Sequence, residues 1–204
     1  MTRPQAVVFD LGNVLIGWDP TPALVAGVGE QEASAFLGAE DFDFMAWNHV
    51  QDTGRTWDEA ESEVAGTHPH WERHARAYRA NFALSLTGAI EENVAVLRDL
   101  HEAGVPVFAL TNWSTELFPV ALATYDFLAL FDDIVVSADE LLAKPDPRIF
   151  DVLAARTGIP HQACVFVDDK AENVAAAEAV GMDGIVFRPD GSLRTELRER
   201  GLPV

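Results

Sequence analysis

Acidic, hydroxyl and amide side chains follow three separate apolar runs of the chain. These polar residues are Asp10, the pair Thr111-Asn112 and the pair Asp168-Asp169. If each apolar run is a buried strand of one parallel sheet, its polar residues lie at the carboxyl edge, where open α/β sheets bind ligands. Carboxylates that meet there repel one another unless a divalent cation joins them, and their hard oxygen atoms suit Mg²⁺. The pattern predicts a metal site at this edge, although Asp10 alone would equally suit a cap of the following turn.

Groups that could bind phosphate accompany these acids. The hydroxyl of Thr111 and the amide of Asn112 suit phosphate oxygens, as do the amides at a helix N-terminus. Lys144 lies between Ala143 and Pro145, in a loop just before an expected helix, and supplies a cation. The formal net charge of the chain is −19, so an anionic substrate needs a locally positive site, such as a bound metal with a lysine beside it. The same net charge argues against nucleic acids and anionic membrane surfaces as partners.

A parallel sheet with helices on both faces would position these residues. From Thr87 onward, strand-like apolar runs alternate with helical stretches, which is the pattern of an α/β fold. We expect strands at 6–9, 105–110, 134–136, 164–167 and 185–187. We expect helices at 90–103, 115–125, 146–156, 172–180 and 193–200. Gly104 and Gly158 stand where the first and third of these helices should end.

Residues 17–86 show helical spacing and no convincing strand. Thr56 and Glu59 form a capping box at the start of one helix, because each side chain can satisfy a backbone amide of the first turn. Other helices are expected at 31–37, at 42–50 and from Pro69 through Phe82. We therefore expect an all-helical cap domain at 17–86, inserted into an α/β core domain made of residues 1–16 and 87–204.

The composition limits the class of protein and its surroundings. The chain has 204 residues, 49% of them hydrophobic, which suits one medium domain with a sizeable insertion. No apolar run is long enough to span a membrane, and the first run ends in Asp10, so we expect neither a membrane anchor nor a signal peptide. The single cysteine, Cys164, allows no internal disulfide and fits a reducing, cytoplasmic location. We expect a monomer or a homodimer.

The order of these residues closely resembles the haloacid dehalogenase superfamily, most of whose members are Mg²⁺-dependent phosphatases. The four motifs of that family match FDLGNV at Asp10, ALTN at Thr111, AKPDP at Lys144 and VDDKAEN at Asp168-Asp169. The resemblance covers nearly the whole chain, and the helical insertion resembles the mobile four-helix cap of that family. The segment DLGNV is similar to a branch that contains α-D-glucose-1-phosphatase-like enzymes.

The resemblance implies a reaction and a set of site residues. Asp10 and Lys144 are the expected catalytic residues of a hydrolase that removes phosphate from a small phosphorylated metabolite, with sugar phosphates among the candidates. Asp10 would be the nucleophile and would form an aspartyl-phosphate. The expected ligands of Mg²⁺ are Asp10, the Gly12 carbonyl, Asp168 and Asp169. The expected substrate contacts are Asn13, Thr111, Asn112 and Lys144.

Two positions depart from the family pattern. Typical phosphatases of the superfamily carry a second Asp two residues after the nucleophile as general acid and base, and here that position is Gly12. Asn13 or Asp19 could substitute, or the leaving oxygen could need less protonation, as the acidic anomeric oxygen of a sugar 1-phosphate does. The second departure is Asn173, where many members place another acid.

Three other functions compete with a phosphatase. A 2-haloacid dehalogenase would share the nucleophile, but those enzymes lack a metal and carry small polar residues where Asp168 and Asp169 stand. A phosphate-sensing or partner-binding module on the same fold would explain Gly12, but it would have no reason to keep Asp10, Lys144 and Asp169 together. A phosphomutase would need the acid-base side chain that Gly12 lacks. We therefore favour a phosphatase.

Side chains of the helical insertion are further candidates. Trp18, Trp47 and Arg55 are those we expect to take part in substrate recognition. His68, His70 and His74 are close enough in sequence to suit a zinc ion, but no acid or cysteine completes a recognisable motif, so we expect them on a solvated helix face.

Overall fold

A computed structural model describes residues 4–204, and its centre is a five-stranded parallel sheet in the order β5-β4-β1-β6-β7. The strands are β1 (Ala6–Phe9), β4 (Val107–Thr111), β5 (Asp133–Val136), β6 (Cys164–Asp168) and β7 (Asp183–Val186). Phe9 pairs with Ala109 on one side and with Val167 on the other, so Asp10 lies level with Asp168 at the carboxyl edge. This register brings residues from three distant segments to one place.

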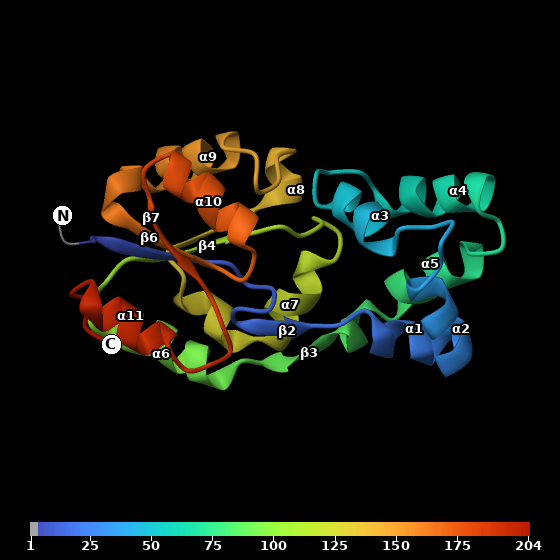
Figure 1. Cartoon of the computed structure of the whole chain (residues 1–204), viewed down its shortest axis with the longest axis horizontal. Coiled ribbons are helices and arrows are strands. Elements are labelled where there is room, and N and C mark those ends of the chain that lie inside the picture. Colours follow the sequence, from blue (N-terminus) through green and yellow to red (C-terminus); the bar gives the residue numbers. More distant parts are fainter. Residues whose placement is uncertain (1–3) are drawn as a thin grey trace.

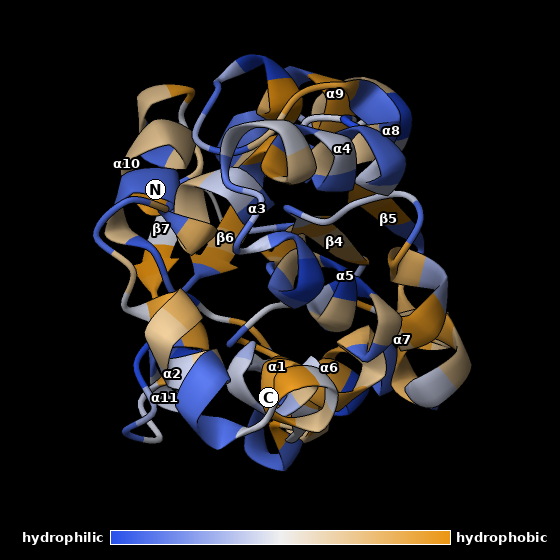
Figure 2. Cartoon of the chain, turned by 90° about the vertical axis from the view of Figure 1, so that its right-hand side faces the viewer, coloured by the Kyte–Doolittle hydropathy of each residue, from blue (hydrophilic) through white to orange (hydrophobic). Residues whose placement is uncertain are grey.

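Helices cover both faces of the sheet (Figure 1). One face carries α6 (Glu91–Glu102), α7 (Phe118–Thr124) and α11 (Leu193–Glu199), and the other carries α8 (Ser137–Glu140), α9 (Arg148–Thr157) and α10 (Ala171–Ala179). Side chains of a strand point alternately to the two faces. Val7 and Phe9 accordingly belong to the core beneath α6 and α11, and Ala6 and Val8 to the core beneath α9 and α10. Figure 2 shows these strands as hydrophobic ribbons surrounded by more polar helices.

All remaining long helices are inserted between two short strands. β2 (Ile16–Trp18) and β3 (Leu86–Ala89) run antiparallel, with Ile16 opposite Ala89, and they join the sheet to the helical part (Figure 1). The inserted helices are α1 (Thr21–Val28), α2 (Glu30–Leu37), α3 (Phe44–Gln51), α4 (Trp57–Thr67), α5 (Glu72–Ala80) and the short 3₁₀ helix η1 (Phe82–Ser85). Their shared core is aromatic, with Phe36 against Phe44, and Trp57 between Trp47 and Tyr78. Aromatic side chains bury much apolar area each, which lets these short helices form a core.

The α/β fold with an inserted helical segment is confirmed, and the differences lie at element ends. The predicted absence of strands in 17–86 is wrong at its borders, because β2 and β3 pair there. The helix expected from Pro69 begins at Glu72, after a turn, and α9 begins at Arg148, whose amide donates to the Asp146 carboxylate. The sequence pattern did not predict α8, nor the 3₁₀ helices η2 (Asp126–Leu130) and η3 (His161–Ala163).

The predicted capping box is confirmed. The Thr56 hydroxyl accepts a hydrogen bond from the Glu59 amide, and the Glu59 carboxylate accepts one from the Thr56 amide. This start of α4 matters for the site because Trp57, the next residue, lines the cavity described below. Within residues 4–204, no helix combines the length and the hydropathy needed to cross a bilayer.

Candidate active site

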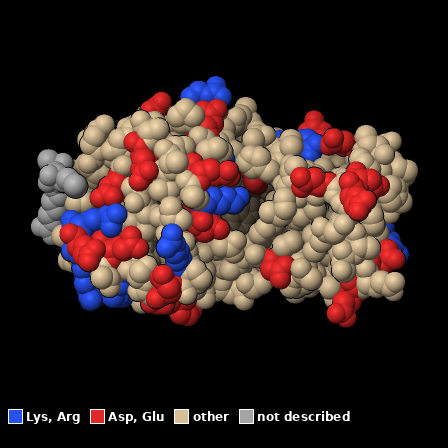
Figure 3. All heavy atoms as spheres, in the orientation of Figure 1, with Lys and Arg blue, Asp and Glu red and all other residues tan. Residues whose placement is uncertain are grey.

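The polar residues predicted at strand ends meet in one cavity. Asp10 follows β1, Thr111 ends β4 and Asp168 ends β6, and the sheet edge they form faces the inserted helices across a cavity of about 270 Å³. Asp10, Thr111 and Asp169 line it from the sheet side. Figure 3 shows the surface hollowed between the part built on the sheet and the helical part. The cavity is therefore the candidate active site.

Asp10 is held in place from two directions. Its backbone amide donates to the Val167 carbonyl at 2.8 Å, and its Oδ1 atom accepts from the Leu11 amide at 2.7 Å. Burial raises the pKa of Asp10 to about 6, Lys144 works against this shift, and the carboxylate of Asp168 adds to it. An attacking carboxylate must be ionised, so this position requires positive charge beside it.

Lys144 supplies that charge although its side chain is only 1% exposed. Its Nζ atom lies 3.0 Å from Asp10 Oδ1 and 2.7 Å from Asp168 Oδ2, and it donates to the Leu110 carbonyl at 2.7 Å. Burial alone would lower the pKa of Lys144, but Asp10 and Asp168 together raise it above its ordinary value. These contacts therefore favour the charged form of the ammonium beside Asp10.

Asn112, predicted as a substrate contact, has its amide engaged elsewhere. Its Oδ1 accepts from the Lys144 amide at 2.8 Å, and its Nδ2 donates to the Lys144 carbonyl at 2.9 Å. These two bonds fix the loop that carries Lys144 against the end of β4. The hydroxyl-bearing neighbour Thr111 is buried and lines the cavity.

The Asp168 carboxylate is fully buried and surrounded by donors. Oδ1 accepts from the Lys170 amide and from Asn173 Nδ2, and Oδ2 accepts from Lys144 and from the same Asn173 nitrogen. Asn173 thus fills the position where many family members place an acid, and its neutral amide stabilises Asp168 instead of repelling it. This carboxylate orients Lys144.

The cluster of acids fits a magnesium ion. One carboxylate oxygen each from Asp10, Asp168 and Asp169 lies within 4.8 Å of the others, and hard oxygen donors of this kind suit Mg²⁺. Burial, with a contribution from Asp168, also raises the pKa of Asp169, so the acids are crowded with negative charge that a cation would relieve. Because Asp168 already accepts four hydrogen bonds, Asp10 and Asp169 are the better placed ligands. The backbone at Gly12 lines the same cavity.

Gly12 leaves room where the family places its second Asp. A Cβ atom at Gly12 would meet nothing within 4 Å, so packing does not exclude a side chain there. Neither proposed substitute suits acid-base work, because Asn13 carries a neutral amide and Asp19 is not among the residues that line the cavity. Asn13 adopts a left-handed conformation with φ 55° and accepts from the Trp18 amide, and Asp19 accepts from the Thr21 amide at the start of α1. Asn13 does line the cavity, as predicted for a substrate contact.

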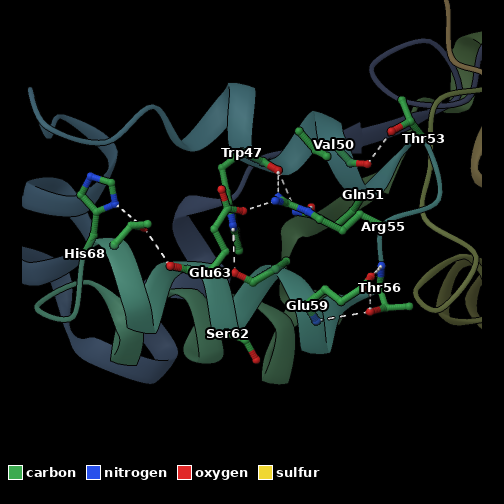
Figure 4. Close-up of polar contacts among 12 residues, drawn as sticks. Trp47, Val50, Gln51, Thr53, Arg55, Thr56, Glu59, Ser62, Glu63 and His68 are labelled. Atoms are coloured by element: carbon green, nitrogen blue, oxygen red, sulfur yellow. Dashed lines mark hydrogen bonds and ion pairs between the residues drawn. The ribbon is translucent and has the colours of Figure 1, made fainter.

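The candidates from the helical part divide into two groups. Trp18 lines the cavity, and its indole nitrogen donates to the Tyr78 hydroxyl at 3.2 Å. Trp47 is buried and donates to the Ala60 carbonyl. Arg55 binds Gln51, Glu63 and the Trp47 carbonyl, as Figure 4 shows, so Arg55 and Trp47 hold α3 and α4 together.

The predicted solvated histidine face is wrong for one member. His74 is only 2% exposed, packs against Phe36 and Trp71, and lies 3.1 Å from the Glu32 carboxylate. His70 does lie at the surface, where it contacts Asp41. His74 is buried in the core of the inserted helices because α5 packs against α2.

The prediction missed one face of α3. Met45, Asn48, His49 and Asp52 line the cavity opposite the sheet edge. Their spacing of i, i+3, i+4 and i+7 is that of a single helix face. The helical spacing can be recognised in the sequence, but nothing in the sequence indicates that this face of α3 points at Asp10.

Comparison with known proteins agrees with this geometry. A family model described as a haloacid dehalogenase-like hydrolase matches residues 4–181. The chain belongs to the haloacid dehalogenase-like hydrolases.

Relatives of this hydrolase cover nearly its full length. It is 27% identical to a sesquiterpene phosphatase of Aspergillus oryzae over 97% of each chain. It is 30% identical to a ribulose-1,5-bisphosphate 5-phosphatase of Halopiger xanaduensis over 96% of this chain and 90% of that one. A haloacid dehalogenase family enzyme of Bacteroides thetaiotaomicron, solved as a magnesium complex, shares the fold with a TM-score of 0.75 and 19% identity, over 97% of this chain and 100% of that chain. The chain is an enzyme of the phosphatase class.

Proposed function

We propose that this hydrolase is a Mg²⁺-dependent phosphatase of small phosphorylated metabolites that works through a phosphorylated Asp10. The observation that carries the proposal is the buried contact of Lys144 with Asp10 and Asp168 at the edge of the cavity. It keeps a carboxylate and a cation together where a phosphate could enter. Asp10 and Asp169, with the Gly12 carbonyl, would hold Mg²⁺, which when bound would neutralise phosphate oxygens and the crowded carboxylates.

Each residue then has a defined task in the reaction. A carboxylate oxygen of Asp10 attacks phosphorus, and the bond to the leaving oxygen breaks, which gives an aspartyl-phosphate. The Lys144 ammonium and the Thr111 hydroxyl bind the equatorial oxygens, whose charge the transition state spreads. Water then attacks phosphorus, inorganic phosphate leaves and the Asp10 carboxylate is restored.

The paired acids support this reaction over dehalogenation. Asp168 and Asp169 bring two further carboxylates within 4.8 Å of Asp10, an arrangement that favours a cation and disfavours a haloacid carboxylate. A phosphate-sensing module would not require the nucleophile to be held so tightly. The retained contacts of Asp10, Lys144 and Asp168 therefore favour an enzyme.

The cavity supports a small substrate with a partly apolar leaving group. Trp57, Tyr78 and Phe82, all from the inserted segment, line it. The Trp57 indole nitrogen donates to the Ser114 hydroxyl at 3.0 Å, so a polar group of this wall is already satisfied. An aromatic wall of this kind can pack against a sugar ring of a sugar 1-phosphate or against the hydrocarbon of an isoprenoid phosphate. By their names, the sesquiterpene phosphatase acts on an apolar substrate of this kind and the ribulose-1,5-bisphosphate 5-phosphatase acts on a sugar phosphate.

We further propose that residues 17–86 form a cap domain that opens and closes over a core domain of residues 1–16 and 87–204. β2 and β3 are the two connections, and Ile16, the first residue of β2, pairs with Ala89 at the end of β3 and forms a bridge to Gly12, two residues after Asp10. Glu116 accepts from the Trp57 amide at 2.8 Å and pairs with Arg79 at 2.8 Å, which ties α4 and α5 to the sheet part in the closed arrangement. Closure would exclude bulk water during phosphoryl transfer, and opening would release the product.

A substrate panel with three matched conditions tests the proposal. Glucose 1-phosphate, phosphoglycolate, farnesyl monophosphate and a 2-haloacid are assayed with Mg²⁺, with EDTA, and with Asp10→Asn. We expect phosphate release that EDTA and Asp10→Asn both abolish. Halide release that survives EDTA would favour the dehalogenase, and no turnover of any compound, with phosphate binding retained, would favour the phosphate-sensing module.

A further inference from the structure

The proposed reaction needs a proton that none of the residues given a task in it above can supply. When the bond between phosphorus and an alcohol oxygen breaks, an unprotonated alkoxide is a poor leaving group, so a general acid usually assists. Gly12 has no side chain, Asn13 carries a neutral amide, and Asp19 is not among the residues that line the cavity. The donor must therefore come from another wall of the cavity.

The opposite wall carries an imidazole with a carboxylate behind it. His49 and Asp52, on one face of α3 and at its end, both line the cavity that contains Asp10. His49 Nδ1 lies 3.4 Å from Asp52 Oδ2, and the two side chains are 48% and 15% exposed. A carboxylate at Nδ1 orients the ring and stabilises its protonated form, which leaves Nε2 as the group that can exchange a proton.

The end of α3 is anchored to the sheet part through one hydroxyl. Ser137 Oγ, fully buried, donates to the Asp52 carbonyl at 2.6 Å and accepts from the Trp113 amide at 3.0 Å. Trp113 is two residues beyond Thr111, at the edge of the sheet where the phosphate site lies. This junction fixes the His49–Asp52 pair relative to the proposed phosphate site.

We propose that His49, positioned by Asp52, is the general acid and base that replaces the missing side chain at Gly12. The proposal rests on the phosphatase function proposed above and names a residue that the family motifs do not contain. His49 donates its Nε2 proton to the leaving oxygen while the bond from Asp10 to phosphorus forms and the bond from phosphorus to that oxygen breaks. The neutral imidazole then takes a proton from the water that attacks the aspartyl-phosphate, which regenerates the imidazolium and releases inorganic phosphate.

The charges around His49 are compatible with this role. The hydrogen bond that the imidazole donates to Asp52 raises the pKa of His49, partial burial opposes this, and Lys170 and Glu172 on the facing loop and helix act in opposite directions. Burial raises the pKa of Asp52, while His49, Lys170 and Lys144 favour its ionised form. The imidazole therefore faces one close carboxylate and two more distant charges of opposite sign.

Two substrates of nearly equal size and unequal leaving groups test the role. p-Nitrophenyl phosphate releases an acidic phenol that needs little protonation, whereas phenyl phosphate releases a far less acidic one. We expect His49→Gln to lower kcat/KM for phenyl phosphate by about 100-fold or more, the usual contribution of a general acid, and for p-nitrophenyl phosphate by only a few-fold. Activity on p-nitrophenyl phosphate also reports that the variant is folded. His101→Gln, on the exposed surface of α6, is the matched control and should leave both values unchanged.

Asp10→Asn separates this proposal from the one on which it rests. If the wild type hydrolyses both compounds and Asp10→Asn hydrolyses neither, the phosphatase assignment holds. The role of His49 as general acid is then refuted by either of two results. His49→Gln could lose activity by the same factor on both compounds, or it could keep full activity on both. Added imidazole provides a second measurement, because it should restore phenyl phosphate hydrolysis to His49→Gly without accelerating the wild type. Absence of such rescue together with equal losses would make His49 a structural residue.

Discussion

The Lys144 ammonium lies 3.0 Å from the Asp10 carboxylate, and both side chains are almost entirely buried. A buried ion pair contributes little net stability relative to an apolar pair, but removal of one partner leaves an uncompensated charge. Lys144 also contacts Asp168, so the loss of Lys144 would leave two buried carboxylates without their counter-charge. This contact therefore couples the stability of the fold to the chemistry of the site.

The first prediction follows from that coupling. Lys144→Met keeps most of the side-chain volume and removes the charge, so we expect the free energy of unfolding, measured with denaturant in EDTA, to fall by about 3–5 kcal/mol. Arg148→Met is the control, because Arg148 forms its ion pair with Asp146 at the surface and should change stability little. Equal stability of the two variants would mean that Lys144 is not the counter-charge of the site.

The second prediction concerns pH and magnesium. The pKa of Asp10 is raised to about 6 from 3.8, so the folded protein binds this proton more tightly than the unfolded chain does. Its contribution to stability is therefore complete below about pH 4 and is lost as the pH rises to about 6. Mg²⁺ would compete with the same proton. We expect Mg²⁺ to raise the melting temperature at pH 7.5 and to have little effect at pH 5.

A variant of a proposed metal ligand tests whether the stabilisation by Mg²⁺ comes from binding to Asp10, Asp168 and Asp169. Asp169→Ala should remove most of the shift caused by Mg²⁺ at pH 7.5, because Asp169 is a proposed ligand. Asp126→Ala changes an exposed acid far from the cavity and should leave the shift intact. An Mg²⁺ response that is the same in both variants, or that does not depend on pH, would contradict the proposed metal site.

The third prediction concerns the partner of His49. Asp52 raises the pKa of His49, so the imidazole stays protonated to higher pH in the wild type than it would alone. A general acid is active while protonated, and kcat/KM for phenyl phosphate should fall as the pH rises through this pKa. Asp52→Asn should move that fall to lower pH. If kcat/KM falls at the same pH in the wild type and in Asp52→Asn, Asp52 is not the partner that sets the pKa of His49.

The fourth prediction tests the cap. Glu116 bonds both the Trp57 amide and Arg79, so Glu116→Ala should weaken the closed arrangement. We expect faster hydrogen exchange in β2 and β3 and a higher KM for glucose 1-phosphate or farnesyl monophosphate, whichever the panel identifies. Asp126→Ala removes an exposed ion pair with Arg98 in the sheet part alone and serves as the control. Unchanged exchange and KM in Glu116→Ala would argue against a closed state held by these contacts.

Sequence reasoning predicted the sheet and its polar edge well. Short apolar runs that end in acids, separated by helical stretches, specify parallel strands whose carboxyl ends meet, and the structure brings Asp10, Lys144, Asp168 and Asp169 together. Local signals such as the Thr56 capping box were equally legible, because they depend on residues three positions apart.

Long-range contacts of individual side chains could not be predicted. Asn112 has the chemistry of a phosphate ligand, and its use as a support for the Lys144 loop depends on a contact across 32 positions of sequence. His74 is polar and yet buried, because the packing of α5 against α2 decides its surroundings. His49 and Asp52 have helical spacing, but which face of α3 looks into the cavity depends on how the helices are set against the sheet.

The position of β1 in the sheet has a consequence for synthesis on the ribosome. β1 is paired with β4 and β6, and Val7 meets Val107 and Val165, residues that emerge much later. At the usual rates of translation, β1 waits roughly ten to thirty seconds for its second neighbour. The inserted helices, whose contacts are largely local, are complete long before then and can fold first. The apolar strand β1 thus keeps at least one unpaired edge for that interval, and this edge is open to chaperones or to aggregation during synthesis.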